Sequence, residues 1–100
     1  MVLELTKDNF DEFINNKLVL VEFKASWCMP CKHLVPELEK VAQMGYLVGS
    51  CDIEINKEIS DKYNISNIPA LCLFIDSKLE AVSVGYRGSK LIKEFIKAYE

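Results

Sequence analysis

The sequence has no apolar run long enough to cross a membrane and no surplus of positive charge. Its 12 lysines and arginines stand against 15 aspartates and glutamates, which gives a formal net charge of −3 at pH 7. A membrane-spanning helix needs roughly 20 consecutive apolar residues, and binding to nucleic acid or anionic membranes is driven by basic surfaces. We therefore expect neither a nucleic-acid partner nor a membrane.

A secretory pattern is also missing. Residues 1–8 contain no basic segment followed by an apolar one, and the chain has no repeat, linker or low-complexity segment. The 100 residues are enough for one domain with a hydrophobic core and too few for two. We expect a single cytoplasmic domain over residues 1–100 that acts as a monomer.

Ligands for metal or haem are scarce. His33 is the only histidine, and the cysteines number four. Tetrahedral zinc needs about four ligands, yet Cys51 and Cys72 each stand alone on predicted strands. A c-type haem motif needs histidine directly after Cys31, where Lys32 stands. We expect no metal and no cofactor, with Cys51 and Cys72 buried as small hydrophobic residues.

Hydrophobic periodicity predicts strands that alternate with helices, followed by a final hairpin and helix. Thr6 and Ser89 are expected to cap the first and last helices. The second strand shows little polar alternation, as in a strand that is covered on both faces. The predicted strands are residues 2–5, 18–23, 46–53, 70–75 and 79–84, and the predicted helices are residues 7–15, 31–44, 56–63 and 89–99.

The stretch Trp27-Cys28-Met29-Pro30-Cys31-Lys32 lies where the buried second strand gives way to a helix. Two cysteines at this spacing close a small disulfide ring or open to two thiols. A helix N-terminus stabilises an anion through its free N–H groups and its dipole, and the thiolate is the reactive form of cysteine. We predict a redox site in which Cys28 attacks a disulfide and Cys31 resolves the intermediate.

The chain resembles the thioredoxin family over nearly its whole length. The resemblance implies an α/β fold with a central mixed sheet and helices on both faces, and a cis peptide bond before Pro69 beside the cysteines. It also implies a reductase of protein disulfides that a thioredoxin reductase reduces again. The matching stretches are Val21-Glu22-Phe23, Trp27 to Lys32, Pro36, Ile68-Pro69-Ala70 and Val84-Gly85.

A surface that binds disulfide-containing proteins is implied by the same resemblance. We expect an extended target segment to pair with an open backbone edge at Ile68, beside Pro69. The residues expected to form this surface are Trp27, Met29, Pro30, Ile68, Pro69 and Gly85.

The sequence departs from the family at several positions. Met29 replaces the usual glycine between the cysteines, Glu22 stands where aspartate is usual, and Lys24 replaces a common tryptophan. Ala70 follows the proline in place of threonine, and no lysine stands near Ser50. Because the residues between the cysteines tune the redox potential, a disulfide oxidase or isomerase of the same fold is an alternative. A binding module without catalytic activity is another.

Glu22 is the one charged residue of the predicted strand 18–23. Burial of an unpaired carboxylate is costly, so we expect desolvation to raise its pKa. Glu22 would then exchange a proton with Cys31, through water. The alternative is that this end of the strand is wet, or that Lys24 or another cation reaches the carboxylate.

Overall fold

The computed structural model describes residues 1–100, and its strands form one mixed sheet of five with the order β1-β3-β2-β4-β5. The strands β1, β3 and β2 run parallel to one another. Strand β4 runs antiparallel to both of its neighbours, β2 and β5. The predicted mixed sheet is thus confirmed. The strands are β1 (Val2–Leu5), β2 (Leu18–Lys24), β3 (Leu47–Asp52), β4 (Ala70–Ile75) and β5 (Lys78–Val84).

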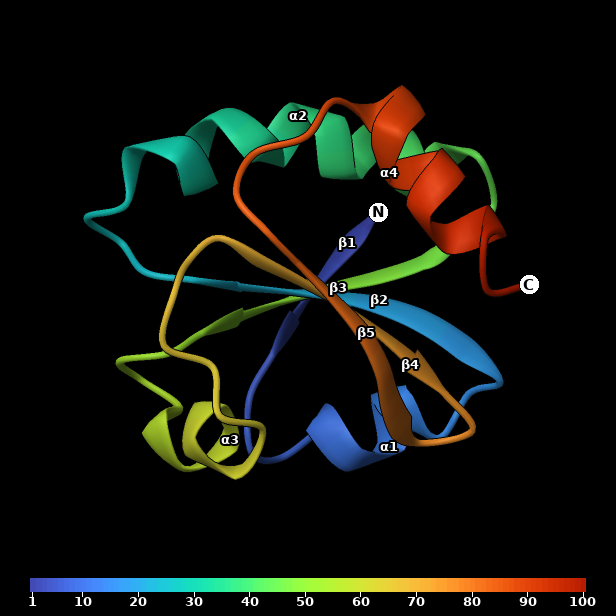
Figure 1. The fold of residues 1–100 in the computed structure, drawn as a ribbon. Coiled ribbons are helices and arrows are strands. Elements are labelled where there is room, and N and C mark those ends of the chain that lie inside the picture. Colours follow the sequence, from blue (N-terminus) through green and yellow to red (C-terminus); the bar gives the residue numbers. More distant parts are fainter.

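Four helices cover the two faces of this sheet, in the order that the periodicity predicts. In Figure 1, α2 and α4 lie on one face, and α1 and α3 lie on the other. None of the helices is long and apolar enough to cross a membrane. The helices are α1 (Phe10–Ile14), α2 (Met29–Gln43), α3 (Lys57–Lys62) and α4 (Ser89–Lys97).

The central strand β2 is buried on both faces, which explains its nearly continuous apolar sequence. Val21 and Phe23 belong to the core that includes residues of α1, whereas Leu20 packs in the core with α2 and α4. Alternate residues of a strand point to opposite faces, so Glu22 shares the face of Leu20. The carboxyl group therefore lies on the side covered by the helix that begins at the cysteines.

The first helix begins three residues later than the pattern predicts, and Thr6 does not cap it. Residues 6–9 instead form a turn, in which Asn9 Oδ1 accepts the backbone N–H of Thr6 at 2.7 Å. The Thr6 hydroxyl accepts the N–H of Asp8 at 3.2 Å. The helix starts at Phe10 because Thr6 and Asn9 direct their side-chain oxygens into this turn.

Ser89 does not cap the last helix either. It is the first helical residue, and Gly88 occupies the capping position without a side-chain bond. The backbone N–H of Ser89 donates instead to Glu37 Oε1 of α2 at 2.8 Å. A carboxylate from a neighbouring helix thus satisfies a free N–H group that a cap would otherwise take.

The hairpin between β4 and β5 turns more tightly than expected. Only Asp76 and Ser77 separate the strands, so β5 starts at Lys78. Their φ angles of 50° and 68° match the two-residue hairpin turn that follows the natural twist of the strands.

Candidate active site

Cys28 and Cys31 form a disulfide at the N-terminus of α2, with their Cα atoms 5.3 Å apart. The helix begins at Met29, two residues earlier than predicted, so Cys28 occupies the capping position. Its Sγ accepts the backbone N–H of Cys31 at 3.3 Å. A sulfur atom thus takes the place of the side-chain oxygen that usually caps a helix. A thiolate at Cys28 would receive the same bond and the positive end of the helix dipole.

Both cysteines are nearly buried in the disulfide form. Cys28 is 4% exposed and Cys31 is 3% exposed, so the two side chains differ little in exposure. They pack with Ala25, and the side chains of Ile53 and Ile68 cover the cluster. Segments that follow β2, β3 and α3 therefore meet around the disulfide.

An apolar rim projects beside the disulfide. Trp27 is 65% exposed and Met29 is 59% exposed, and Pro30 is exposed as well. The indole Nε1 of Trp27 donates to Glu54 Oε2 at 3.0 Å, which fixes the orientation of the ring. No pattern in the sequence indicated Glu54, because the loop after β3 comes close to Trp27 only in the folded chain.

The loop before β4 brings Ile68 and Pro69 to the cysteines. The Ile68–Pro69 peptide bond is cis, as predicted. The carbonyl of Pro69 accepts the N–H of Gly85 at 2.8 Å, whereas the backbone N–H and C=O of Ile68 have no intramolecular hydrogen bond. Gly85 has a φ of 102°, a conformation that side chains disfavour. The backbone edge at Ile68 is therefore open to pairing.

The carboxyl group of Glu22 is buried behind this surface, with only 1% of the residue exposed. Its Oε1 accepts the hydroxyl of Ser50 at 3.0 Å, and its Oε2 is buried without a partner. Burial raises the pKa of Glu22 to about 7, against smaller lowering effects of the Ser50 hydrogen bond and the Lys24 charge. The predicted rise in pKa is confirmed, and Glu22 forms no hydrogen bond with Cys31.

Both alternatives for Glu22 are wrong. The end of the strand is not wet, because the side chain is almost fully covered. Lys24 does not pair with it either, since Lys24 Nζ lies 2.8 Å from Glu4 Oε1 instead. The sequence did not reveal Ser50 as the partner, because only the parallel register of β2 and β3 sets the two residues opposite each other.

A family model for thioredoxin matches residues 1–98 of this chain. The chain belongs to the thioredoxin family. A thioredoxin of Buchnera aphidicola is 39% identical to it, over 98% of this chain and 94% of its own length. A thioredoxin of Chlamydia pneumoniae is 37% identical over 99% of each chain. A solved variant of thioredoxin from Halobacterium salinarum superposes with a TM-score of 0.90 at 30% identity, and covers 97% of this chain and 88% of its own.

The family and the Cys28–Cys31 disulfide identify the chain as a thiol–disulfide oxidoreductase. Members of the thioredoxin family generally act on disulfide substrates together with a thioredoxin reductase. In thiol–disulfide exchange the two sulfur atoms of such a pair carry the electrons.

A shallow groove adjoins the thioredoxin disulfide on the side of α2. It measures about 510 Å³ and is lined by Met29, Pro30, His33, Pro36 and Tyr86. Tyr86, in the loop after β5, was not predicted as part of this surface. His33 is exposed on α2.

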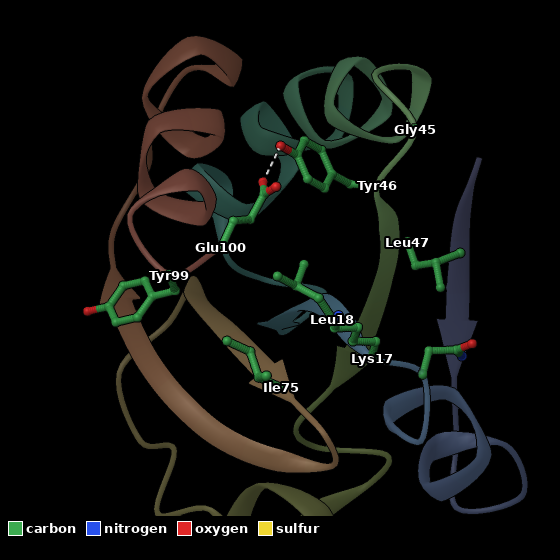
Figure 2. A pocket seen from close by; sticks show the side chains of 9 residues that line it. Lys17, Leu18, Gly45, Tyr46, Leu47, Ile75, Tyr99 and Glu100 are labelled. Carbon is green, nitrogen blue, oxygen red and sulfur yellow. Dashed lines mark hydrogen bonds between the residues drawn. The ribbon is translucent and has the colours of Figure 1, made fainter.

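A larger hollow lies at the opposite end of the fold from the cysteines. It measures about 650 Å³ and includes Leu18, where β2 begins, whereas the cysteines follow the end of that strand. Figure 2 shows the hydrogen bond of 2.6 Å there between the Tyr46 hydroxyl and Glu100 Oε1. The groove beside the disulfide is open to solvent, and such a surface suits a protein segment better than an enclosed small molecule.

The other two cysteines of the chain lie within the core, as expected. Cys51 and Cys72 are free, fully buried and part of the core on the α1 face of the sheet. Burial raises the pKa of Cys51 to about 11 and that of Cys72 to about 12. Both thiols are thus kept protonated and away from the reactive pair. No three His, Cys, Asp or Glu side chains gather into a group that could hold a metal ion.

Proposed function

We propose that this chain is a single-domain, monomeric reductase of protein disulfides in the cytoplasm, with a thioredoxin reductase as its electron donor. In the proposed cycle Cys28 attacks, Cys31 resolves, and Glu22 takes the proton that Cys31 must lose. The observation that carries this assignment is the capping position of Cys28, whose Sγ accepts the N–H of Cys31 at 3.3 Å. The cytoplasm suits this role because disulfides there are transient and catalytic.

The exchange proceeds in two steps that balance in electrons and protons. The Cys28 thiolate attacks one sulfur of the target disulfide, a mixed disulfide forms, and the other target sulfur leaves as a thiolate that takes up a proton. Cys31 then loses its proton and attacks the sulfur of Cys28. The Cys28–Cys31 bond forms, the bond between Cys28 and the target breaks, and the remaining target sulfur leaves as a thiolate that takes up a proton, so two electrons have passed to the target.

The different positions of the two cysteines in α2 support different roles. Cys28 caps the helix, where the N–H of Cys31 and the helix dipole favour a thiolate before any target arrives. Cys31 lies inside the first turn, so its own sulfur gains less from the dipole. It must therefore be deprotonated during the reaction.

Glu22 suits the role of proton acceptor for Cys31. A carboxyl group with a pKa of about 7 is close to half ionised at neutral pH, so it can both accept and return a proton. It lies on the face of the sheet that α2 covers. Because no hydrogen bond joins Glu22 to Cys31, the proposed transfer passes through water.

The proposed target is an extended protein segment that carries an accessible disulfide. The open N–H and C=O groups of Ile68 support strand-like pairing with such a segment. Trp27 and Met29 supply exposed apolar area on the other side of the cysteines. Pro30 is exposed and Gly85 is half-buried, and both belong to the proposed surface, whereas Pro69 is buried next to Ile68.

The roles of the cysteines can be tested with a protein disulfide as target and a dithiol as electron source. Cys28→Ser should abolish reduction, because no nucleophile remains. Cys31→Ser should accumulate the mixed disulfide with the target, because attack survives and resolution does not. Normal turnover by Cys28→Ser would show that the roles are assigned wrongly.

The role of Glu22 needs single-turnover kinetics that resolve attack from release across pH. Glu22→Gln keeps the shape of the side chain and removes the base. We expect slower release of the reduced target and an almost unchanged first attack. If release is unchanged at every pH, Glu22 is not the proton acceptor.

A further inference from the structure

A strip of polar side chains extends from the buried Glu22 to the surface at the β1 edge of the sheet. Parallel pairing sets Glu22 opposite Ser50, and Ser50 opposite Glu4. Residues opposite each other in neighbouring strands point to the same face, so all three lie on the face that α2 covers. Lys24 follows Glu22 by two positions on β2 and shares that face.

Two short contacts define this strip. The Ser50 hydroxyl donates to Glu22 Oε1 at 3.0 Å, and Lys24 Nζ lies 2.8 Å from Glu4 Oε1. Ser50 is buried, whereas the side chains of Lys24 and Glu4 are 29% and 58% exposed. Because β3 lies between β2 and β1, the ion pair spans the strand that carries Ser50. Solvent therefore reaches the ion pair but does not reach Glu22.

The remaining elements around Glu22 contribute few titratable groups. β4 places Leu71 opposite Glu22, and α2 contributes Cys31, which is held in the disulfide. β3 contributes Asp52 opposite Lys24, and its carboxylate already accepts two backbone N–H groups. The ion pair is thus the main source of charge that is free to act on Glu22.

We propose that the Lys24–Glu4 ion pair tunes the proton held by Glu22 and thereby sets the pH range in which Cys31 resolves the mixed disulfide. Both are positioning residues, because neither touches the reacting sulfur atoms. This inference rests on the proposed function of Glu22 as proton acceptor. Lys24 favours the charged carboxylate and Glu4 disfavours it, and each holds the other at a fixed place.

Removing either member of the pair has opposite consequences for Glu22. Glu4→Gln removes a negative charge and releases Lys24, so the pKa of Glu22 should fall by about half a unit. Lys24→Gln removes the positive charge and should raise it by a similar amount. In the double variant the two effects should largely cancel. Loss of a merely structural ion pair would not produce shifts of opposite sign.

The experiment measures the titration of Glu22 and the release of reduced target separately. The titration of Glu22 is measured by NMR of the carboxyl carbon in glutamate-labelled protein, with its signal assigned by Glu22→Gln. The release of reduced target is measured in single turnovers across pH. The matched controls are Lys57→Gln and Asp61→Asn, which break another exposed ion pair of 2.8 Å on α3, on the opposite face of the sheet.

The pH dependence of release should follow the titration of Glu22. In Glu4→Gln both should move to lower pH, in Lys24→Gln both should move to higher pH, and in the controls neither should change. Shifts that are absent, or that share one sign, overturn the inference. If Glu22→Gln slows release but the Lys24 and Glu4 variants do not change its pH profile, the inference fails and the proposed function of Glu22 stands. If Glu22→Gln leaves release unchanged, the proposed function of Glu22 itself fails.

Discussion

Replacement of Glu22 by glutamine should stabilise the oxidised protein, and the gain should grow as the pH rises. Burial raises the pKa of Glu22 from 4.5 to about 7, so between these values the folded protein holds a proton that the unfolded chain has lost. The difference in pKa, at about 1.4 kcal/mol per unit, corresponds to about 3 kcal/mol. This stability is present in full below pH 4.5 and is lost as the pH rises through about 7.

Glutamine does not titrate, so Glu22→Gln should lack this loss. Relative to the parent protein, its free energy of unfolding should rise by about 3 kcal/mol between roughly pH 4.5 and pH 8. Urea unfolding of the oxidised protein at a series of pH values measures this difference. Glu80→Gln, which changes an exposed carboxyl group on β5, serves as the control. Parallel pH profiles for Glu22→Gln and the parent would refute the burial argument.

Three further predictions concern the neighbours of this group and the thiols. Ser50→Ala removes a hydrogen bond that lowers the pKa of Glu22, so NMR titration should find a higher pKa for Glu22 than in the parent protein. An unchanged or lower pKa would contradict the assignment of this bond. In the reduced protein, Cys28 should be alkylated at lower pH than Cys31, because Cys28 caps α2. Mass spectrometry can follow the alkylation of each cysteine, and equal titration of the two thiols would remove the electrostatic argument. Cys51 and Cys72 are fully buried, so they should react slowly until the protein is unfolded, and fast labelling in the native state would contradict that.

The sequence predicted the layers of the fold and the location of the site well, because both depend on patterns along the chain. The apolar run of β2 indicated a strand covered on both faces, and the motif that begins at Trp27 lies where the strand meets the helix. The single charge within residues 18–23 was enough to predict the raised pKa of Glu22. Each of these features is carried by residues that are neighbours in sequence.

The features that the sequence did not predict depend on contacts between distant residues or on unusual caps. The first helix starts late because the side-chain oxygens of Asn9 and Thr6 accept the backbone N–H groups of Thr6 and Asp8 in a turn. α2 starts early because the sulfur of Cys28, rather than an oxygen, caps it. The partners Ser50 and Glu4 follow only from the register of three parallel strands.

The reduction potential of the Cys28–Cys31 couple tests the central claim most directly, because reductases and oxidases of this fold use the same atoms. It can be measured by equilibrating the protein with glutathione buffers and quantifying the dithiol and disulfide forms. A protein-disulfide reductase should give a strongly reducing potential, close to the value of thioredoxins, which is about −270 mV. A value near about −120 mV, as in a strong disulfide oxidase, would contradict the assignment.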